Sequence, residues 1–308
     1  MKVFIDGSAG TTGLRIHERL AARKDVDLLI LPDDIRKEPA ARKEAINSAD
    51  IAFLCLPDAA AKEAVAMIEG DTAVIDTSTA HRVNSDWAYG FPELPGQRGK
   101  IASSRRIANP GCHASGFIAL VAPLVHAGIL PKDAALTCFS LTGYSGGGKK
   151  MIAEYEADGR NPLLDAPRQY GISQSHKHLP EMTVICGLDK PPVFSPIVAP
   201  FYSGMEVTVP LFTSQMRGSI NDVKDAYREL YTTPLVHFDE SADEGGFLSA
   251  GALSGYDDMQ VSVAGNDERI ILTSRFDNLG KGASGAAIQN MNILMGVEET
   301  TGLVLSNH

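Results

Sequence analysis

Short apolar runs alternate with helical segments along the first third of the chain. The predicted helices cover residues 14–23, a segment near 39–48, and 58–68, and the apolar runs around them predict the strands KVFID, VDLLIL, IAFLCL and TAVIDTS. Strands that alternate with helices pair in parallel through right-handed crossovers. We therefore predict a doubly wound parallel sheet, which binds its ligand at the carboxyl ends of the strands.

The pattern changes after Gly128. Apolar and polar residues then alternate, as at Val207, Val209 and Leu211, which favours a mixed or antiparallel sheet with one covered face. The predicted strands are AALTCFSLTGY, PVFSPIVAP, MEVTVPLF, MQVSVAG and RIILTSRFD, with the helix NDVKDAYRELY among them. The fold class is accordingly α/β, a Rossmann dinucleotide-binding domain followed by a second, α+β domain.

The chain is predicted to form two domains, the first of which contains residues from both ends of the sequence. The dinucleotide-binding domain is placed at residues 1–112 and is completed by the C-terminal helix in 278–308, because the small-residue helix GASGAAIQNMNILMG is expected to pack back on it. Residues 113–277 form the catalytic and oligomerisation domain.

Composition places the chain among ordinary globular proteins. Of its 308 residues, 44% are hydrophobic and 21% charged, and the net charge of -10 comes without a long basic run. This argues against nucleic acid or an anionic membrane as the main partner and favours a small-molecule substrate. The N-terminus does not resemble a signal peptide, and no run of about 18 apolar residues occurs, so we expect a cytoplasmic protein.

A glycine loop, GSAGTTG, directly follows the first strand and opens a helix. Gly7 permits the tight turn, Gly10 lets the backbone approach a pyrophosphate, and Gly13 allows close packing of helix on strand. The phosphates would lie on the amides at the helix start. A plain strand-to-helix turn is the alternative, but the surrounding βαβ pattern favours a dinucleotide.

The stretch LPDDIRK leaves the choice between NAD and NADP open. Asp33 or Asp34 could accept hydrogen bonds from ribose hydroxyls of NAD, whereas Arg36 and Lys37 suit the 2′-phosphate of NADP. A solvated loop without a ligand is equally compatible with these residues.

The stretch ANPGCHASGF contains the candidate nucleophile. Cys112 follows a Pro-Gly turn at the start of an apolar helix, where unpaired amides and the helix dipole favour a thiolate and offer donors to an oxyanion. Cys55, Cys138 and Cys186 lie in apolar runs predicted as strands and are interpreted as small hydrophobic residues. The cysteines form no CxxC pair, so we expect neither disulfides nor structural zinc.

Two histidines in QYGISQSHKHLPEM are candidates for the proton carrier. Alternation along a strand would put His176 and His178 on one face, with Glu181 near enough to orient a ring. An HxH pair can also bind a metal, but no further ligand accompanies it, so we predict no metal site. The role of His113 stays undecided.

Two further stretches have candidate binding residues. In STAHRV, Arg82 follows the fourth strand and could hold a phosphate, or it could pair with Glu93. TGYSGGGKK, at 142–150, is predicted to be a flexible glycine loop able to approach a flat ring or a carboxamide, or else a plain turn, since turns favour glycine.

Together these residues resemble the N-acetyl-gamma-glutamyl-phosphate reductase family in its shorter form. The resemblance covers essentially the whole chain and rests on DGSAGTTGLRIHERL, AFLCLPD, VIDTSTAHRV, YGFPELP, ANPGCHASG, TGYSGGGK, HKHLPE and DNLGKGASGAAIQNMNILMG. Aspartate semialdehyde dehydrogenase and, more distantly, glyceraldehyde-3-phosphate dehydrogenase are relatives of this family. It implies NADP as cofactor, a role in arginine biosynthesis, and a cytoplasmic homodimer or homotetramer.

The resemblance also implies roles for individual residues. Cys112 would be the nucleophile and His176 the acid/base, while Arg82 and His178 would bind substrate and Asn278 the nicotinamide carboxamide. The remaining expected cofactor contacts are Gly7, Ala9, Gly10, Thr11, Thr12, Gly13, Arg36, Pro57 and Gly146. Longer members differ at LPDDIRK, so the contacts to the 2′-phosphate are the least secure.

The expected reaction is reductive dephosphorylation of N-acetyl-γ-glutamyl phosphate through a thioester on Cys112. An aspartate semialdehyde dehydrogenase would use the same chemistry on another aldehyde. Two alternatives come from other classes of protein. A dinucleotide-binding redox sensor would show no turnover, and a cysteine hydrolase would show turnover without a cofactor.

Overall fold

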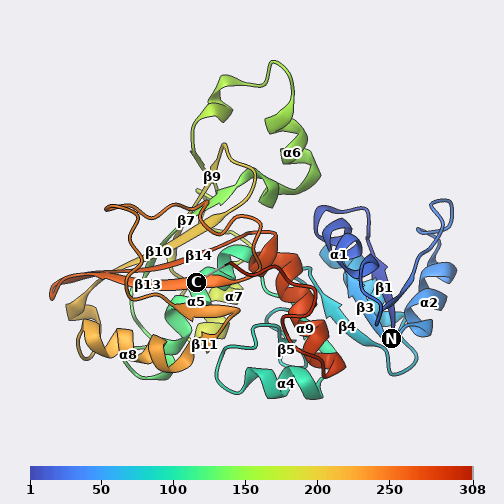
Figure 1. The fold of residues 1–308 in the computed structure, drawn as a ribbon, viewed down its shortest axis with the longest axis horizontal. Coiled ribbons are helices and arrows are strands. Elements are labelled where there is room, and N and C mark those ends of the chain that lie inside the picture. Colours follow the sequence, from blue (N-terminus) through green and yellow to red (C-terminus); the bar gives the residue numbers. More distant parts are fainter. Residues whose placement is uncertain (307–308) are drawn as a thin grey trace. The chain divides into compact units, whose positions relative to one another are not determined.

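Helices alternate with parallel strands through the N-terminal part of the computed structural model, as the apolar pattern predicts (Figure 1). The structure describes residues 1–306. They divide into two units: the first contains 1–92, 96–110 and 283–303, and the second contains 93–95, 111–282 and the described residues from 304 onward. No helix among the described residues is both long and apolar enough to cross a membrane.

A six-stranded sheet, parallel throughout, forms the centre of the first unit. Its order is β2-β1-β3-β4-β6-β5, so the winding direction changes between β1 and β3, the place where such sheets bind ligands. The strands are β1 (Lys2–Asp6), β2 (Asp27–Leu29), β3 (Ile51–Leu54), β4 (Ala73–Asp76), β5 (Ala88–Tyr89) and β6 (Arg106–Ala108).

Helices cover both faces of this sheet. Ile5 packs with Ile16 of α1 and Ile288 of α9 on one face, and the adjacent Phe4 packs with Ile46 of α2 on the other. Because successive strand residues point to opposite faces, the two clusters form separate cores. This confirms the doubly wound prediction. The helices are α1 (Thr11–Ala21), α2 (Pro39–Ser48), α3 (Asp58–Ala66), α4 (Gln97–Ser103) and α9 (Gly285–Met295).

The second unit contains an eight-stranded mixed sheet with the order β11-β12-β13-β14-β10-β7-β9-β8. The pairs β7·β9 and β12·β13 are parallel and the other pairs antiparallel, which confirms the predicted α+β domain. The strands are β7 (Thr137–Gly143), β8 (Arg168–Gln169), β9 (Val193–Ala199), β10 (Met205–Phe212), β11 (Thr232–Thr233), β12 (Val236–Phe238), β13 (Met259–Gly265) and β14 (Arg269–Phe276).

One face of this sheet is covered by the apolar helix α5 (Cys112–His126), nearly all of whose residues are buried. A Cβ atom at Gly116 would lie 2.4 Å from Cγ2 of Val207, so glycine lets the helix approach β10 closely. The helices α7 (Leu179–Cys186) and α8 (Ile220–Leu230) pack against α5. The outer face of the sheet carries no helix in Figure 1 and exposes Phe139 and Ile271.

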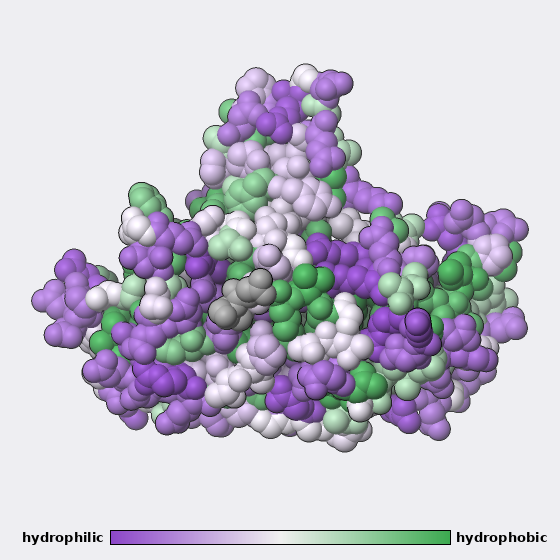
Figure 2. All heavy atoms as spheres, viewed as in Figure 1, coloured by the Kyte–Doolittle hydropathy of each residue, from purple (hydrophilic) through white to green (hydrophobic). Residues whose placement is uncertain are grey.

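A segment of the second unit projects beyond the sheet around α6 (Gly148–Glu156), drawn in green at the top of Figure 1. It has an apolar cluster of its own, in which Tyr155 and Leu164 are buried against Val198. Figure 2 shows that polar residues prevail on its outer surface.

Three sequence predictions are wrong at this level. The stretch 142–150 is no flexible loop, because a 3-10 turn, Tyr144–Gly147, leads directly into α6. His176 and His178 lie in the loop before α7 and not on a strand, and Cys186 ends that helix. Pro180 in the first turn favours a helix there, and a short apolar run such as LPEMTVIC does not distinguish helix from strand.

Candidate active site

The glycine loop at the carboxyl end of β1 has the conformation that its sequence predicts. Gly7 has a φ of +87°, and a Cβ atom there would lie 2.3 Å from the carbonyl oxygen of Cys55. A Cβ atom at Gly13 would lie 2.5 Å from the Gly7 oxygen, so both positions require glycine. At Gly10 the nearest atom would be 3.5 Å away, an ordinary contact, so no neighbour within the protein demands a glycine.

The start of α1 is suited to phosphate oxygens. Gly10 is the N-cap residue, and no side chain caps the first turn or places an acidic group there. The hydroxyl oxygen of Thr11 is buried and has no hydrogen-bond partner among the described residues. Unpaired helix amides and an unpaired buried hydroxyl both fit the oxygens of a pyrophosphate. Ala9 and Thr12 flank these groups in the same loop and turn.

Beside the loop is a pocket of about 260 Å³ at the carboxyl ends of β1 and β2. Arg36 and Lys37 line it, and Asp33, paired with Arg36 at 3.1 Å, is almost fully exposed. Arg42 also lines the pocket, but its guanidinium binds the carboxylate of Asp6 at 2.8 Å. The excess of cations over acids at this pocket suits an anionic group. Pro57, the N-cap residue of α3, follows the end of β3.

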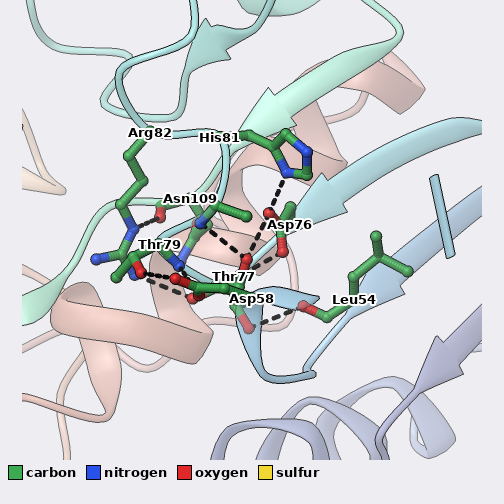
Figure 3. Close-up of polar contacts among 10 residues, drawn as sticks. Leu54, Asp58, Asp76, Thr77, Thr79, His81, Arg82 and Asn109 are labelled. Atoms are coloured by element: carbon green, nitrogen blue, oxygen red, sulfur yellow. Dashed lines mark hydrogen bonds and ion pairs between the residues drawn. The ribbon is translucent and has the colours of Figure 1, made fainter. Parts of the chain in front are cut away.

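Arg82 lies in the turn after β4, held by backbone oxygens (Figure 3). Its Nε donates to the Asn109 oxygen at 2.9 Å and its Nη2 to the Thr77 oxygen at 3.0 Å. The fully buried carboxylate of Asp76 fixes the same turn, because it accepts from Nδ1 of His81 at 2.6 Å. The carboxyl ends of β4 and β6 thus hold a buried guanidinium in a defined direction.

Cys112 is the first residue of α5 and is half-buried. The Gly111 amide before it donates to Oε1 of Glu181 at 2.8 Å, so Glu181 binds the start of this helix. The other thiols are in less reactive surroundings: burial raises the pKa of Cys55 to about 12 and raises the pKa values of Cys138 and Cys186 above their usual range. Among the four thiols, that of Cys112 alone lies at the start of a helix, a position that favours a thiolate.

Three histidine rings gather beside this helix start. The ring centroids of His176 and His178 are 4.8 Å apart, and that of His113 lies 5.7 Å and 5.6 Å from them. Burial lowers the pKa of His176, and the neighbouring Lys177 lowers it further. The His178 amide donates to Nδ1 of His176 at 3.2 Å, so a neutral His176 ring carries its proton on Nε2 and can donate it.

His113, undecided from sequence, is a buried residue with hydrogen bonds at both ring nitrogens. Its Nδ1 lies 2.6 Å from Oγ of Ser140, and its Nε2 lies 2.6 Å from the hydroxyl of Tyr170. Neither Ser140 nor Tyr170 was predicted from the sequence to belong to the site. Tyr170 precedes the HxH pair by only six residues and could have been singled out, whereas Ser140 is one of several small polar residues on β7.

Asn278 and Gly146 are brought together. Oδ1 of Asn278 accepts from the Gly204 amide at 2.9 Å, and its Nδ2 donates to Oγ of Ser145 at 2.9 Å. A Cβ atom at Gly146 would lie 3.5 Å from Nδ2 of Asn278. The carboxamide of Asn278 is thus fixed in direction, with a glycine alongside.

The comparisons with known protein families agree with this arrangement. Residues 112–278 match the model "Semialdehyde dehydrogenase, dimerisation domain", and 32–103 match "Semialdehyde dehydrogenase, NAD binding domain". The solved aspartate semialdehyde dehydrogenases from Francisella tularensis (TM-score 0.71, 15% identity, covering 96% of this chain and 100% of that one) and Vibrio cholerae (form II, 0.68, 18%, 96% and 98%) share the fold. Fold and site thus define a two-domain oxidoreductase that uses a nicotinamide dinucleotide.

Sequence relatives narrow this class further. The chain is 46% identical to the N-acetyl-gamma-glutamyl-phosphate reductases of Brucella ovis and Brucella melitensis biotype 2, over 96% of its own length and 99% of theirs. The chain therefore belongs to the N-acetyl-gamma-glutamyl-phosphate reductase family, a branch of the semialdehyde dehydrogenases, and the resemblance found in the sequence is confirmed.

Proposed function

We propose that the protein reduces N-acetyl-L-γ-glutamyl phosphate to N-acetyl-L-glutamate 5-semialdehyde and releases phosphate, a step of arginine biosynthesis in the cytoplasm. The observation that carries this proposal is the half-buried thiol of Cys112 at the start of α5, next to His113, whose ring centroid is 5.7 Å from that of His176, in a chain that closely resembles reductases of this name. The position of the thiol supplies helix amides to an oxyanion that forms on an attacked carbonyl.

In the proposed reaction the Cys112 thiolate attacks the γ-carbonyl carbon, and the C–O bond to phosphate breaks to leave a thioester. Arg82, aimed by the oxygens of Thr77 and Asn109, binds the phosphate. His176 would donate its Nε2 proton to the oxygen that becomes negative when the thioester is reduced. It would take the proton back when the S–C bond breaks, the Cys112 thiolate re-forms and the aldehyde leaves. His178, buried next to His176, contacts the substrate.

The proposed cofactor is NADP, whose reduced form supplies hydride to the thioester carbon when bound. Gly7, Gly10 and Gly13, with Ala9, Thr11 and Thr12, would hold its pyrophosphate, and Arg36 its 2′-phosphate. Pro57 would contact the dinucleotide after β3, and Gly146 and Asn278 its carboxamide. Residues 1–112 and 278–308 form the dinucleotide-binding domain in this proposal, and 113–277 the catalytic and oligomerisation domain.

An assay in the reverse direction tests the function. Purified protein should reduce NADP when given N-acetylglutamate semialdehyde and phosphate, and should do so far more slowly with aspartate semialdehyde. Cys112→Ser should lower the rate by roughly a thousandfold or more, whereas Cys55→Ser should leave it unchanged. Equal rates with both aldehydes, or normal turnover by Cys112→Ser, would contradict the proposal.

We also propose a homodimer or homotetramer built on the outer face of the eight-stranded sheet. Phe139 is 49% and Ile271 46% exposed there, and Phe139 lies opposite Thr208, in the middle of the sheet. The family model for this region is named a dimerisation domain. Phe139→Glu should therefore shift sedimentation toward the monomer, whereas Val184→Glu, an exposed change on α7, which packs against α5 on the other face of the sheet, should not.

A further inference from the structure

His113 and its two hydrogen-bond partners form a chain with a defined direction. The ring is buried, and burial, with the nearby charges of His176 and Lys177, lowers the pKa of His113 to about 3. The ring is therefore neutral at physiological pH and carries one N–H, on either Nδ1 or Nε2. Which nitrogen carries the proton decides whether Tyr170 accepts a hydrogen bond from His113 or donates one to it.

Ser140 decides between the two forms. Its hydroxyl lies on β7, is fully buried, and has one hydrogen-bond partner among residues 1–306, Nδ1 of His113 at 2.6 Å. If Nδ1 carried the proton, the hydroxyl proton of Ser140 would be buried without an acceptor, which is unfavourable. Ser140 therefore donates to Nδ1. The ring proton is then on Nε2 and is donated to the Tyr170 oxygen, 2.6 Å away.

The hydroxyl of Tyr170 consequently has a proton to donate elsewhere. Within the described part of the chain its oxygen has no hydrogen-bond partner other than Nε2 of His113. Burial raises the pKa of Tyr170, and the negative charge of Cys112 raises it further, so the hydroxyl keeps its proton next to a thiolate. The residue is also held in place, since its amide donates to the Pro196 oxygen at 3.0 Å and its ring packs in the α6 cluster.

We infer that Tyr170 is a catalytic residue whose hydroxyl donates a hydrogen bond to the substrate carbonyl oxygen as Cys112 attacks. As the S–C bond forms, the π electrons of the carbonyl move to the oxygen, and Tyr170 stabilises this oxyanion without losing its proton. His113 and Ser140 act as positioning residues that turn the donor toward the substrate. The inference rests on the proposed role of Cys112 but requires neither the natural substrate nor NADP.

Two reactions of the Cys112 thiol distinguish a hydrogen bond from Tyr170 to the oxyanion from an indirect effect of Tyr170 on the reactivity of the thiol. p-Nitrophenyl acetate acylates Cys112 through an oxyanion, whereas iodoacetamide alkylates it by direct displacement without one. Tyr170→Phe should slow acylation by about a hundredfold and leave alkylation unchanged. Tyr144→Phe, which removes a hydroxyl bound to Glu156 near α6, is the matched control and should change neither rate.

Ser140→Ala tests the direction of the chain while Tyr170 stays in place. Without the serine hydroxyl, neither tautomer has a partner at Nδ1, so the ring proton is no longer held on Nε2 and Tyr170 donates to Nε2 in part of the molecules. Acylation should therefore slow, but by less than in Tyr170→Phe, and the double variant should lose little more than Tyr170→Phe alone. Acylation at the wild-type rate in Tyr170→Phe, or an equal loss of acylation and alkylation, would overturn the inference. Slow acylation in Tyr170→Phe would support the inference even if the wild-type protein failed to reduce the acyl phosphate. That failure would overturn only the proposed function.

Discussion

At the scale of single residues, surroundings decide what each of the four thiols can do. Cys138 and Cys186 are buried in apolar packing, and their thiols stay protonated because burial disfavours the charge. Cys55 follows β3 at the sheet edge that binds ligands, but burial and the charges of Asp76 and Asp6 keep it a thiol as well. Of the four cysteines only Cys112 begins a helix, so its position distinguishes the proposed nucleophile from the other three thiols.

The buried ring of His113 leads to a prediction about stability and pH. The pKa of His113 is lowered from 6.5 to about 3, so the unfolded chain binds a proton below pH 6.5 that the folded chain does not. The free energy of unfolding should therefore decrease as the pH falls below about 6.5, and His113 alone should contribute a slope approaching about 1.4 kcal/mol per pH unit.

Urea titrations between pH 7 and pH 5 would measure this slope. His113→Gln should make it shallower by up to one proton, whereas His126→Gln, at the exposed end of α5, should leave it unchanged. Parallel slopes for the wild type and His113→Gln would show that the ring takes up a proton in the folded state.

The sequence singles out Cys112 and the histidine pair as candidates but not the groups around the histidine rings. Cys112 stands out because the Pro-Gly turn, the thiol and the helix start are neighbours in the sequence. Ser140 and Tyr170 reach His113 from 27 and 57 residues away, through the pairing of β7 and the return of the chain after β8. The burial of such a side chain and its distant hydrogen-bond partners depend on the tertiary fold, so the neighbouring sequence does not indicate them.

At the scale of elements, strands were easier to predict than short helices. The strands from β1 to β4 and the long strands of the mixed sheet have clear apolar patterns, and α2 matches its predicted range. The helices α4, α6 and α7 were missed. Glycines precede α6, and the run LPEMTVIC of α7 is too short to distinguish a helix from a strand. In α6 the glycine Gly148 has a φ of +71°, so a residue that suggested flexibility serves to join a turn to a helix.

Two glycines of the first βα turn should respond differently to the same substitution. Gly13→Ala places a Cβ atom 2.5 Å from the Gly7 oxygen and should destabilise the fold by about 1–3 kcal/mol. Gly10→Ala meets its nearest atom at 3.5 Å, so stability should be nearly unchanged. The added methyl group faces the proposed pyrophosphate, and the KM for NADPH should rise about tenfold, a loss of ~1.4 kcal/mol in binding.

Thermal unfolding and initial rates of the two variants would check this pair. Gly13→Ala should lower the melting temperature, whereas Gly10→Ala should raise the KM for NADPH at a nearly unchanged melting temperature. Each variant therefore serves as the control for the other. A lowered melting temperature in Gly10→Ala, or an unchanged KM for NADPH in that variant, would contradict the assignment of Gly10 to close backbone approach.

At the scale of the whole molecule, the chain contributes to each unit in several pieces. Residues 93–95 belong to the second unit although the sequence on both sides belongs to the first, and the chain returns to the first unit at Ala283. Periodicity in the sequence indicates which face of an element is buried, but not which unit a three-residue segment joins. The boundaries at 112 and 278 stay a prediction, and they omit this short segment.

A buried ion pair fixes that segment and provides the final prediction. Nζ of Lys281 lies 2.6 Å from Oε1 of Glu93, and both side chains are 1% exposed. Lys281→Met takes a charge-assisted hydrogen bond from a buried carboxylate, so it should lower the free energy of unfolding by about 3–5 kcal/mol. Lys43→Met, which breaks the exposed pair with Glu69, should lower it by less than about 1 kcal/mol. The double variant Lys281→Met with Glu93→Leu should recover much of the loss, since it removes both charges of the pair. Urea midpoints of the cooperative transition would order the variants, and a double variant no more stable than Lys281→Met would show that Glu93 stabilises the fold through contacts other than this pair.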